Sequence, residues 1–183
     1  MFETSHLVLR AYRNSDADAL QEMLNTYSVS IGASTDFVIP HPESFKDTLR
    51  ELINKWTFYA VVEEKATGAF VGNAALRAQN KRDRDALLGI ALVPEKWGKG
   101  YGTEVVNFLA EYAFDGLGMH RVSLEVFANN ERAIALYKQA GFVQEGVKRK
   151  AAWIQGKWVD NVLMGILEED FRETQQQAQQ EKP

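Results

Sequence analysis

The sequence predicts one mixed α/β (α+β) domain, and three observations support this prediction. The chain has 183 residues, a length that suits a single domain with a sizeable core. Segments with the alternation of strands are interspersed with segments whose apolar residues recur at helical spacing. The sequence contains no internal repeat and no linker. We therefore expect one domain over residues 1–172, followed by a disordered, Gln-rich tail over residues 173–183.

The first half of the chain predicts a short strand, two helices and three further strands. Residues 7–11 alternate, and Ser15 is an N-cap for a helix whose apolar residues share one face. After the polar stretch 25–36, a second amphipathic helix is expected over residues 43–55. The three strands are expected at residues 58–64, 69–78 and 86–93. The last of them is a near-continuous apolar run, which is typical of a strand buried on both faces.

The second half predicts two helices and three strands. A glycine loop over residues 98–102 leads into a long helix that ends at Gly116 and Gly118. A strand over residues 121–127 follows, and Asn130 then caps a helix that closes at Gly141. The remainder of the domain reads as two strands within residues 142–167, joined at Gln155-Gly156-Lys157.

The composition excludes several kinds of site and partner. The chain has 21 basic and 25 acidic residues, so no basic excess indicates a nucleic-acid partner. The absence of cysteine excludes disulfides, thiolate nucleophiles and cysteine-based metal or iron–sulfur sites. The three histidines share no metal-ligand spacing, so we expect no metal. Since the sequence has neither a signal peptide nor an apolar run of roughly 18 residues, we expect a cytoplasmic protein without a membrane partner.

A glycine-rich segment between a buried strand and a helix is the most informative part of the sequence. It reads Lys96-Trp97-Gly98-Lys99-Gly100-Tyr101-Gly102-Thr103. Three alternate glycines let the backbone turn tightly and approach a ligand closely. The free N–H groups of the first helical turn then form an anion site that suits a pyrophosphate, and the two lysines would add positive charge. The alternative is a tight structural turn that binds no ligand.

Two other phosphate-binding loops fit this segment less well. A P-loop needs Gly-Lys-Ser/Thr after four spacer residues, and that order is absent. A dinucleotide-binding fingerprint needs glycine where Thr103 stands, and it normally opens the first β-α unit of a longer sheet.

The second informative segment lies about thirty residues later and is a strand, a capped helix and a glycine stop. It reads Asn130-Glu131-Arg132-Ala133-Ile134-Ala135-Leu136-Tyr137-Lys138-Gln139-Ala140-Gly141-Phe142. Considered alone, Asn130 is most simply an N-cap and Tyr137 a half-buried aromatic.

Together the two segments resemble the GNAT superfamily of acyl-CoA N-acyltransferases. The loop from Trp97 to Gly102 is similar to the family's pyrophosphate motif, Gln/Arg-x-x-Gly-x-Gly/Ala, and the later segment to its Asn-x-x-Ala-x-x-x-Tyr-x-x-x-Gly-Phe signature. The chain is most similar to the RimJ/RimL branch in its opening segment, Leu7-Val8-Leu9-Arg10, and in the sequence of the glycine loop. The resemblance extends to about Leu167. It implies a mixed, mostly antiparallel sheet that is splayed at the acetyl-CoA site, with helices on both faces.

The resemblance implies acetyl-CoA as co-substrate and assigns residues to it. The N–H groups of the loop would hold the pyrophosphate, and those near Ile90–Leu92 would polarise the thioester carbonyl. Asn130 would lie near the pantetheine, and Tyr137 would act as general acid to the departing thiolate, because phenol and thiol pKa values lie within about 1.5–2 units. The implied cofactor-binding residues are Ile90, Ala91, Leu92, Val93, Lys96, Trp97, Gly98, Lys99, Gly100, Tyr101, Gly102, Thr103, Asn130, Ala133 and Tyr137.

The sequence departs from the family pattern at two positions. Trp97 stands at the Gln/Arg position, so the phosphate site would rest on backbone N–H groups and the nearby lysines. Leu87 stands where many relatives carry a glutamate that serves as general base. Glu125 is our first candidate for the general base in place of that glutamate, and Asp85 and Asp160 are further candidates. Each of the three also suits a structural role. Attack by a neutral, well-positioned amine also proceeds without a dedicated base.

The resemblance implies direct transfer of the acetyl group to a primary amine in a ternary complex. The acceptor could be a small molecule, a polyamine or a protein N-terminus, and it would lie in a cleft covered by residues 28–56 and the hairpin around Gly156. Trp56 and Asp160 are the substrate-binding residues that we expect, and the branch is compatible with a homodimer. The missing glutamate leaves a second hypothesis open, a CoA-binding sensor or interaction module that has lost catalysis. A third, a nucleotide-binding α/β protein, would bind ATP or NAD instead.

Overall fold

The structure, a computed structural model, describes residues 2–34, 36–80 and 82–180. It divides into two compact units, Met1–Arg77 with Leu88–Val105, and Ala78–Leu87 with Val106–Pro183. In the described residues, eight strands are hydrogen-bonded in the order β1-β2-β3-β4-β5-β6-β8-β7. Strands β5 (Asp85–Leu92) and β6 (Arg121–Phe127) pair in parallel, and the pairs β1/β2, β2/β3, β3/β4, β6/β8 and β7/β8 are antiparallel. The expected mixed, mostly antiparallel sheet is therefore confirmed.

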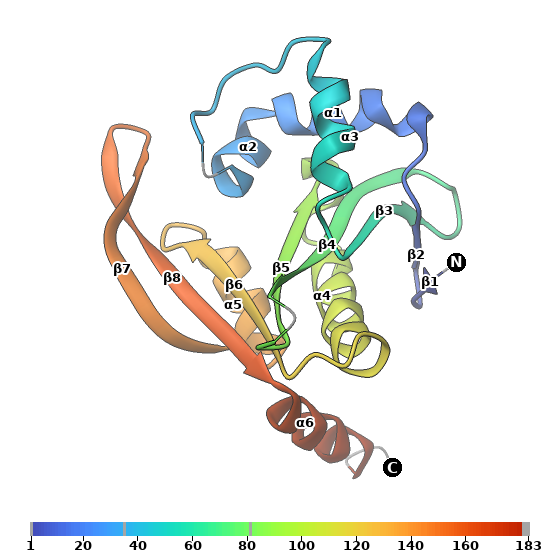
Figure 1. The fold of residues 1–183 in the computed structure, drawn as a ribbon, viewed down its shortest axis with the longest axis vertical. Helices are drawn as coiled ribbons and strands as arrows, with labels where there is room; N and C mark the ends of the chain where they lie inside the picture. Colours follow the sequence, from blue (N-terminus) through green and yellow to red (C-terminus); the bar gives the residue numbers. More distant parts are fainter. Residues whose placement is uncertain (1, 35, 81, 181–183) are drawn as a thin grey trace. The chain divides into compact units, whose positions relative to one another are not determined.

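The first unit combines short strands with three helices. Its elements are β1 (Phe2–Glu3), β2 (Leu7–Arg10), α1 (Ala17–Asn25), α2 (Tyr27–Ala33), α3 (Phe45–Ile53), β3 (Phe58–Glu64), most of β4 (Phe70–Asn80) and the second half of β5. Helix α1 lies beside both α2 and α3 (Figure 1). Their buried side chains meet the sheet in one apolar cluster, formed by Leu20, Met23, Val29, Leu49 and Val61. Trp97 and the end of β5 pack against this cluster, so the helices support the segment that leads into the glycine loop.

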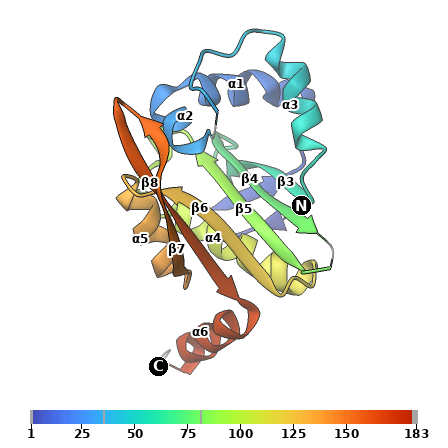
Figure 2. The ribbon, with the colours of Figure 1, turned by 60° about the vertical axis from the view of Figure 1, so that its left-hand side comes forward.

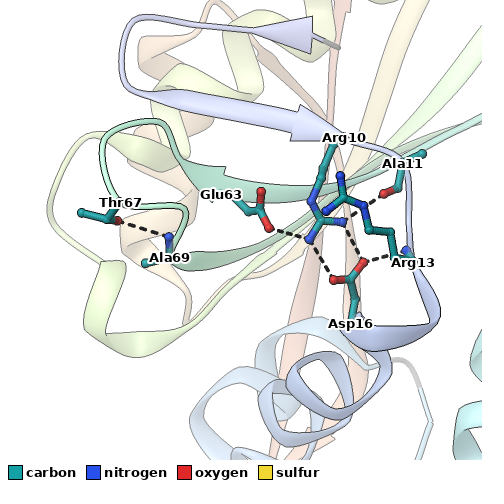
Figure 3. A network of polar contacts seen from close by, with 7 residues as sticks. All are labelled: Arg10, Ala11, Arg13, Asp16, Glu63, Thr67 and Ala69. Carbon is teal, nitrogen blue, oxygen red and sulfur yellow. Dashed lines mark hydrogen bonds and ion pairs between the residues drawn. The ribbon is translucent and has the colours of Figure 1, made fainter.

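An ion-pair network fixes the start of α1 to the sheet (Figure 3). The guanidinium of Arg10 donates to both carboxylate oxygens of Asp16, each at 2.8 Å, and to Oε1 of Glu63 at 2.5 Å. The Arg10 and Asp16 side chains are only 9% and 8% exposed. A hydrogen bond from the Arg10 guanidinium holds the pKa of Asp16 below its usual value. The network connects β2, β3 and the start of α1, because its three residues come from these elements. Removal of one partner would leave a buried charge unpaired, which is strongly destabilising.

The second unit contains a long hairpin with a helix on each side of it in the sequence. Its elements are β6, α5 (Glu131–Gln139), β7 (Val143–Ile154), β8 (Lys157–Leu167) and α6 (Glu168–Gln180). Along β6, Val122, Leu124 and Val126 are buried, which is the alternation of a strand with one face in a core. Figure 2 shows α6 continuing directly from the end of β8. Helix α4 (Tyr101–Glu111) begins in the first unit and ends in the second, where a π-helical turn, Tyr112–Gly116, follows it.

The structure differs from the expected elements in four places. Ser15, expected as the N-cap of the first helix, lies inside a 3-10 turn, Asn14–Asp16, and α1 has Asp16 at its N-cap position. Helix α2 occupies the polar stretch 25–36, where no helix was expected; its buried residues are Val29 and Ser30, too few to give a helical pattern in the sequence. Strand β1 is only two residues long. Helix α6 reaches Gln180 although a disordered tail was expected from residue 173, because acidic residues occupy its first turn and Phe171 is buried. Residues 181–183 of that tail lie outside the described residues, and the domain boundary at residue 172 stays a prediction. Every helix in the described part of the chain is too short or too polar to cross a bilayer.

Candidate active site

The glycine loop has the backbone conformation that the anion-site hypothesis requires. Between the end of β5 and the start of α4, Gly98 and Gly100 have positive φ angles of 73° and 82°. No described atom lies within 4 Å of the place where a Cβ would stand on either residue. The glycines are therefore needed for their left-handed backbone, and the space above them is open to a ligand.

Backbone N–H groups converge at this loop without helical partners. Within the described residues, Glu104 is the first residue of α4 whose N–H meets a backbone carbonyl, that of Gly100 at 3.1 Å. The preceding N–H groups lie at the positive end of the helix dipole, the arrangement that binds phosphates in many proteins. The carboxylate of Glu104 accepts from the N–H of His6 at 2.7 Å and from the hydroxyl of Thr4, so it is engaged elsewhere. The loop therefore offers unpaired backbone donors and open space, the features that a pyrophosphate requires.

The two lysines of the loop have different surroundings. The Nζ of Lys96 is 2.7 Å from Oε1 of Glu64, and both side chains are about one-sixth exposed, at 16% and 15%. The hydroxyl of Tyr101 donates to the same oxygen at 3.0 Å. Chiefly because of the Lys96 hydrogen bond, the pKa of Glu64 is lowered to about 2. Lys96 thus anchors the loop to the end of β3, whereas Lys99 is exposed and makes no ion pair in the described residues.

Trp97 holds the loop against β5. Its indole Nε1 donates to the carbonyl of Leu92 at 2.8 Å, and its ring packs against the apolar cluster of the helices. The tryptophan that replaces the family's Gln/Arg is therefore a structural support for the loop.

The second half of β5 lies close to β4 and to an aromatic ring. A Cβ on Gly72 would stand 2.1 Å from the carbonyl oxygen of Ala91, so only glycine allows this approach of the two strands. On β5, a Cβ at Gly89 would be 3.2 Å from Cη2 of Trp56. The guanidinium of Arg77 lies 5.6 Å from the centre of the same tryptophan ring. Residues Ile90, Ala91, Leu92 and Val93 are all half-buried.

The second unit positions Asn130 and Tyr137 on one helix. The Oδ1 of Asn130 accepts from the N–H of Ala133 at 3.2 Å, so Asn130 is the N-cap of α5, and this interpretation is confirmed. Tyr137 is half-buried two turns later, with its ring 5.9 Å from that of Phe142. Burial raises the pKa of Tyr137 to about 12. The phenol is therefore protonated at neutral pH, as a general acid must be.

The three carboxylates considered as bases are all engaged within the second unit. Glu125 lies on the exposed side of β6, with Oε1 2.9 Å from Nζ of Lys148 and Oε2 2.5 Å from Nδ2 of Asn161. Asp85 accepts from the hydroxyl of Ser123 at 2.7 Å. Asp160 accepts from the N–H of Lys150 at 2.8 Å. Since Lys150 has a φ of 51° within an irregular stretch of β7, Asp160 stabilises a bulge.

A family comparison identifies the chain. The model of the acetyltransferase (GNAT) domain matches residues 6–143, which includes the glycine loop and the Asn130–Phe142 segment. The chain belongs to the GNAT acetyltransferase family. The resemblance that the two motifs indicated is therefore confirmed.

Curated relatives and solved structures cover nearly the whole GNAT chain. The spermidine N(1)-acetyltransferase of Vibrio cholerae is 32% identical over 171 residues, 91% of this chain and 96% of that protein. The uncharacterized N-acetyltransferase YoaA of Bacillus subtilis is 27% identical over 174 residues, 91% of this chain and 96% of that protein. A crystal structure of the Vibrio cholerae spermidine N-acetyltransferase with CoA and spermine superposes with a TM-score of 0.80 at 29% identity, covering 92% of this chain and 99% of that chain.

These relatives establish the enzyme class of the protein. It is an N-acetyltransferase with a GNAT fold, and acetyl-CoA is its co-substrate. In the described part of the chain, no group of three histidine or acidic side chains is placed to hold a metal ion.

Two residues that contact the expected site residues were not found by the sequence reasoning. Glu64, which anchors Lys96 and Tyr101, ends a strand 32 residues before that lysine, and no local pattern connects the two. Arg77 stands in an apolar strand, where a lone arginine is normally a solvated side chain; only its contact with Trp56 draws attention to it.

Proposed function

We propose that the protein transfers the acetyl group of acetyl-CoA directly to a primary amine in a ternary complex, with the loop over residues 98–103 holding the pyrophosphate. The observation that carries this proposal is the pair of left-handed glycines, Gly98 and Gly100, directly before the free N–H groups of α4. The chain has no cysteine to form a thioester intermediate, which favours direct transfer. Lys99 supplies the mobile positive charge, since Lys96 is paired with Glu64.

Tyr137, which was expected as the general acid, is the residue that we propose to act on the departing sulfur. The amine nitrogen forms a bond to the acetyl carbon and gives up a proton to a base or to solvent. The carbon–sulfur bond breaks, and the sulfur leaves with the electron pair and takes up a proton from solvent. Burial places the pKa of Tyr137 at about 12. Because an unperturbed thiol has a pKa of about 8.5, full proton transfer to a solvated thiolate would cost about 5 kcal/mol. We therefore infer that Tyr137 stabilises the departing sulfur mainly by donating a hydrogen bond.

Glu125 remains our proposed base, and its surroundings define how it would act. Both oxygens of the carboxylate already have donors, Lys148 and Asn161. A water held by this cluster would have to carry the proton from the amine. A neutral amine held in position by the enzyme would dispense with this step.

The acceptor and the branch are the finer parts of the proposal. We place the protein in a RimJ/RimL-like branch because two segments of its sequence, Leu7–Arg10 and Trp97–Glu104, resemble that branch. The Vibrio cholerae relative is named as a spermidine acetyltransferase, so a polyamine belongs in any acceptor screen. Trp56 contributes to the acceptor site in our proposal, because its ring covers β5 next to Ile90–Leu92. Asp160 would bind the acceptor through Oδ2, because its Oδ1 accepts from the N–H of Lys150.

Calorimetric titration with acetyl-CoA, beside ATP and NAD, tests the loop. We expect micromolar binding of acetyl-CoA alone, and Gly100→Glu should abolish it by placing a negative side chain on the pyrophosphate. Gly118→Glu is the matched control, since Gly118 also has a positive φ, 63°, and open space around it. Equal affinity in the Gly100 variant and the wild type would contradict the phosphate site. Binding without turnover on any amine would favour the sensor hypothesis instead.

A further inference from the structure

The guanidinium of Arg77 is held over an aromatic ring beside the strand that we propose to carry the thioester. Arg77 is exposed, and its Cζ lies 5.6 Å from the centre of the Trp56 ring. A cation within about 6 Å of a tryptophan face is attracted by the negative charge of the π system. The ring therefore limits the directions that this long side chain can take, and the cation has a defined position.

Trp56 in turn rests on β5. Its Cη2 lies 3.2 Å from the place where a Cβ on residue 89 would stand, so Gly89 leaves the space that the ring occupies. The next residues of the strand are Ile90–Leu92, whose N–H groups we propose to polarise the acetyl carbonyl. Arg77, Trp56 and Gly89 thus form one cluster next to the proposed reaction centre. We call it the arginine cluster.

No carboxylate among the described residues neutralises the positive charge of the arginine cluster. Within the described residues Arg77 has no carboxylate partner, whereas Arg10 is paired with Asp16 and Glu63. The carboxylate of Glu64 is occupied by Lys96. An exposed, oriented guanidinium of this kind attracts an anion and repels a polycation.

We propose that Arg77 selects acceptor amines that carry a carboxylate. This inference rests on the proposed function, because it concerns the acceptor of the same reaction. A guanidinium binds a carboxylate through two parallel hydrogen bonds, which fixes the orientation as well as the position of the acceptor. The amine of the same molecule is then held towards the thioester carbon. The same charge disfavours spermidine and other polyamines, which carry several positive charges.

A panel of matched amines tests this inference in the wild-type enzyme, Arg77→Gln and Arg77→Glu. Free CoA is measured for amino acids against their amides, for peptide amides beginning with Asp or Glu against those beginning with Asn or Gln, and for spermidine. We expect kcat/KM to favour each carboxylate over its amide by about 10- to 150-fold, the contribution of a charge-assisted hydrogen bond. Arg77→Gln should remove this preference, and Arg77→Glu should reverse it towards spermidine. The first two comparisons distinguish a free amino acid from an acidic protein N-terminus as the source of the carboxylate.

Arg50→Gln is the control, since Arg50 is a half-exposed arginine on α3 that pairs with Asp47. It should leave the preference unchanged. Equal rates for carboxylates and amides, or a preference that survives in Arg77→Gln, would overturn the inference while leaving the acetyl transfer intact. If no amine is acetylated, the proposed function fails separately. The inference is then tested by titrating the amino acids into the protein saturated with CoA. It is overturned if the wild type binds no amino acid, or if Arg77→Gln binds them with the same affinity as the wild type.

Discussion

Gly72→Ala should destabilise the protein through a backbone clash between β4 and β5. The added Cβ would stand 2.1 Å from the carbonyl oxygen of Ala91 and 2.8 Å from Cα of Leu92, and backbone atoms cannot move aside as a side chain does. Gly72 also has a φ of 152°, which residues with a Cβ rarely adopt. The left-handed backbone costs about 1–2 kcal/mol, and overpacking of this kind about 1–3 kcal/mol more. We therefore expect a loss of about 2–5 kcal/mol, measured by urea unfolding.

Gly68→Ala separates the clash from the backbone strain. Gly68 has a φ of 69°, and no atom of the described residues lies within 4 Å of the place where a Cβ would stand. Gly68→Ala should therefore lose stability only through backbone strain, by about 1–2 kcal/mol. The difference between the two variants, about 1–3 kcal/mol, corresponds to about 2–12 °C in Tm for a protein of this size. If both variants unfold at the same urea concentration, the close approach of β4 to β5 is not the reason for Gly72.

Three further predictions concern the network of Arg10 and the proposed catalytic residues. Asp16→Asn should cost about 3 kcal/mol at neutral pH, whereas the exposed Asp47→Asn should cost less than about 1 kcal/mol. The pKa of Asp16 is lower in the folded state, so the contribution of its carboxylate to stability is present above the ordinary aspartate pKa and is lost as the pH falls through the folded pKa. The free energy of unfolding in urea should therefore decline less steeply below about pH 4 in Asp16→Asn than in the wild type. Tyr137→Phe should lower kcat by about 10²-fold with acetyl-CoA affinity retained in calorimetry, and an unchanged kcat would contradict its hydrogen bond to the departing sulfur. Glu125→Gln should lower kcat at low pH more than at high pH, where the amine is already neutral, and an equal decrease at all pH values would contradict a role as base.

The fold was predictable where the sequence carries a repeated pattern. The apolar run of β5, the alternation of β6 and the helical spacing in α3 each involve several residues with one periodicity. Helix α2 has two buried residues, and its formation depends on Val29 joining the cluster that α1, α3 and β3 complete. Such an element follows from tertiary packing, which no local pattern records.

The candidate site was predictable in its backbone and not in its ion pairs. Gly98 and Gly100 were expected in a tight turn, and their left-handed φ angles confirm it, because glycine is the residue that tolerates this conformation. Lysine carries no comparable information about its partner. Lys96 was expected beside the phosphate, which stays a prediction, and its Nζ lies 2.7 Å from Oε1 of Glu64, a residue of a different strand that no local pattern indicates.

The same distinction explains why the acceptor is harder to infer than the co-substrate. In our proposal the co-substrate is recognised by backbone groups, which one short glycine segment provides. The acceptor is recognised by side chains, and these come from separate elements. Here Trp56 follows α3, Arg77 lies on β4 and Gly89 on β5, and the three meet only in the folded chain. Identity of 32% to a spermidine acetyltransferase therefore supports the type of reaction, and it leaves room for the different acceptor that we propose on the charge of Arg77.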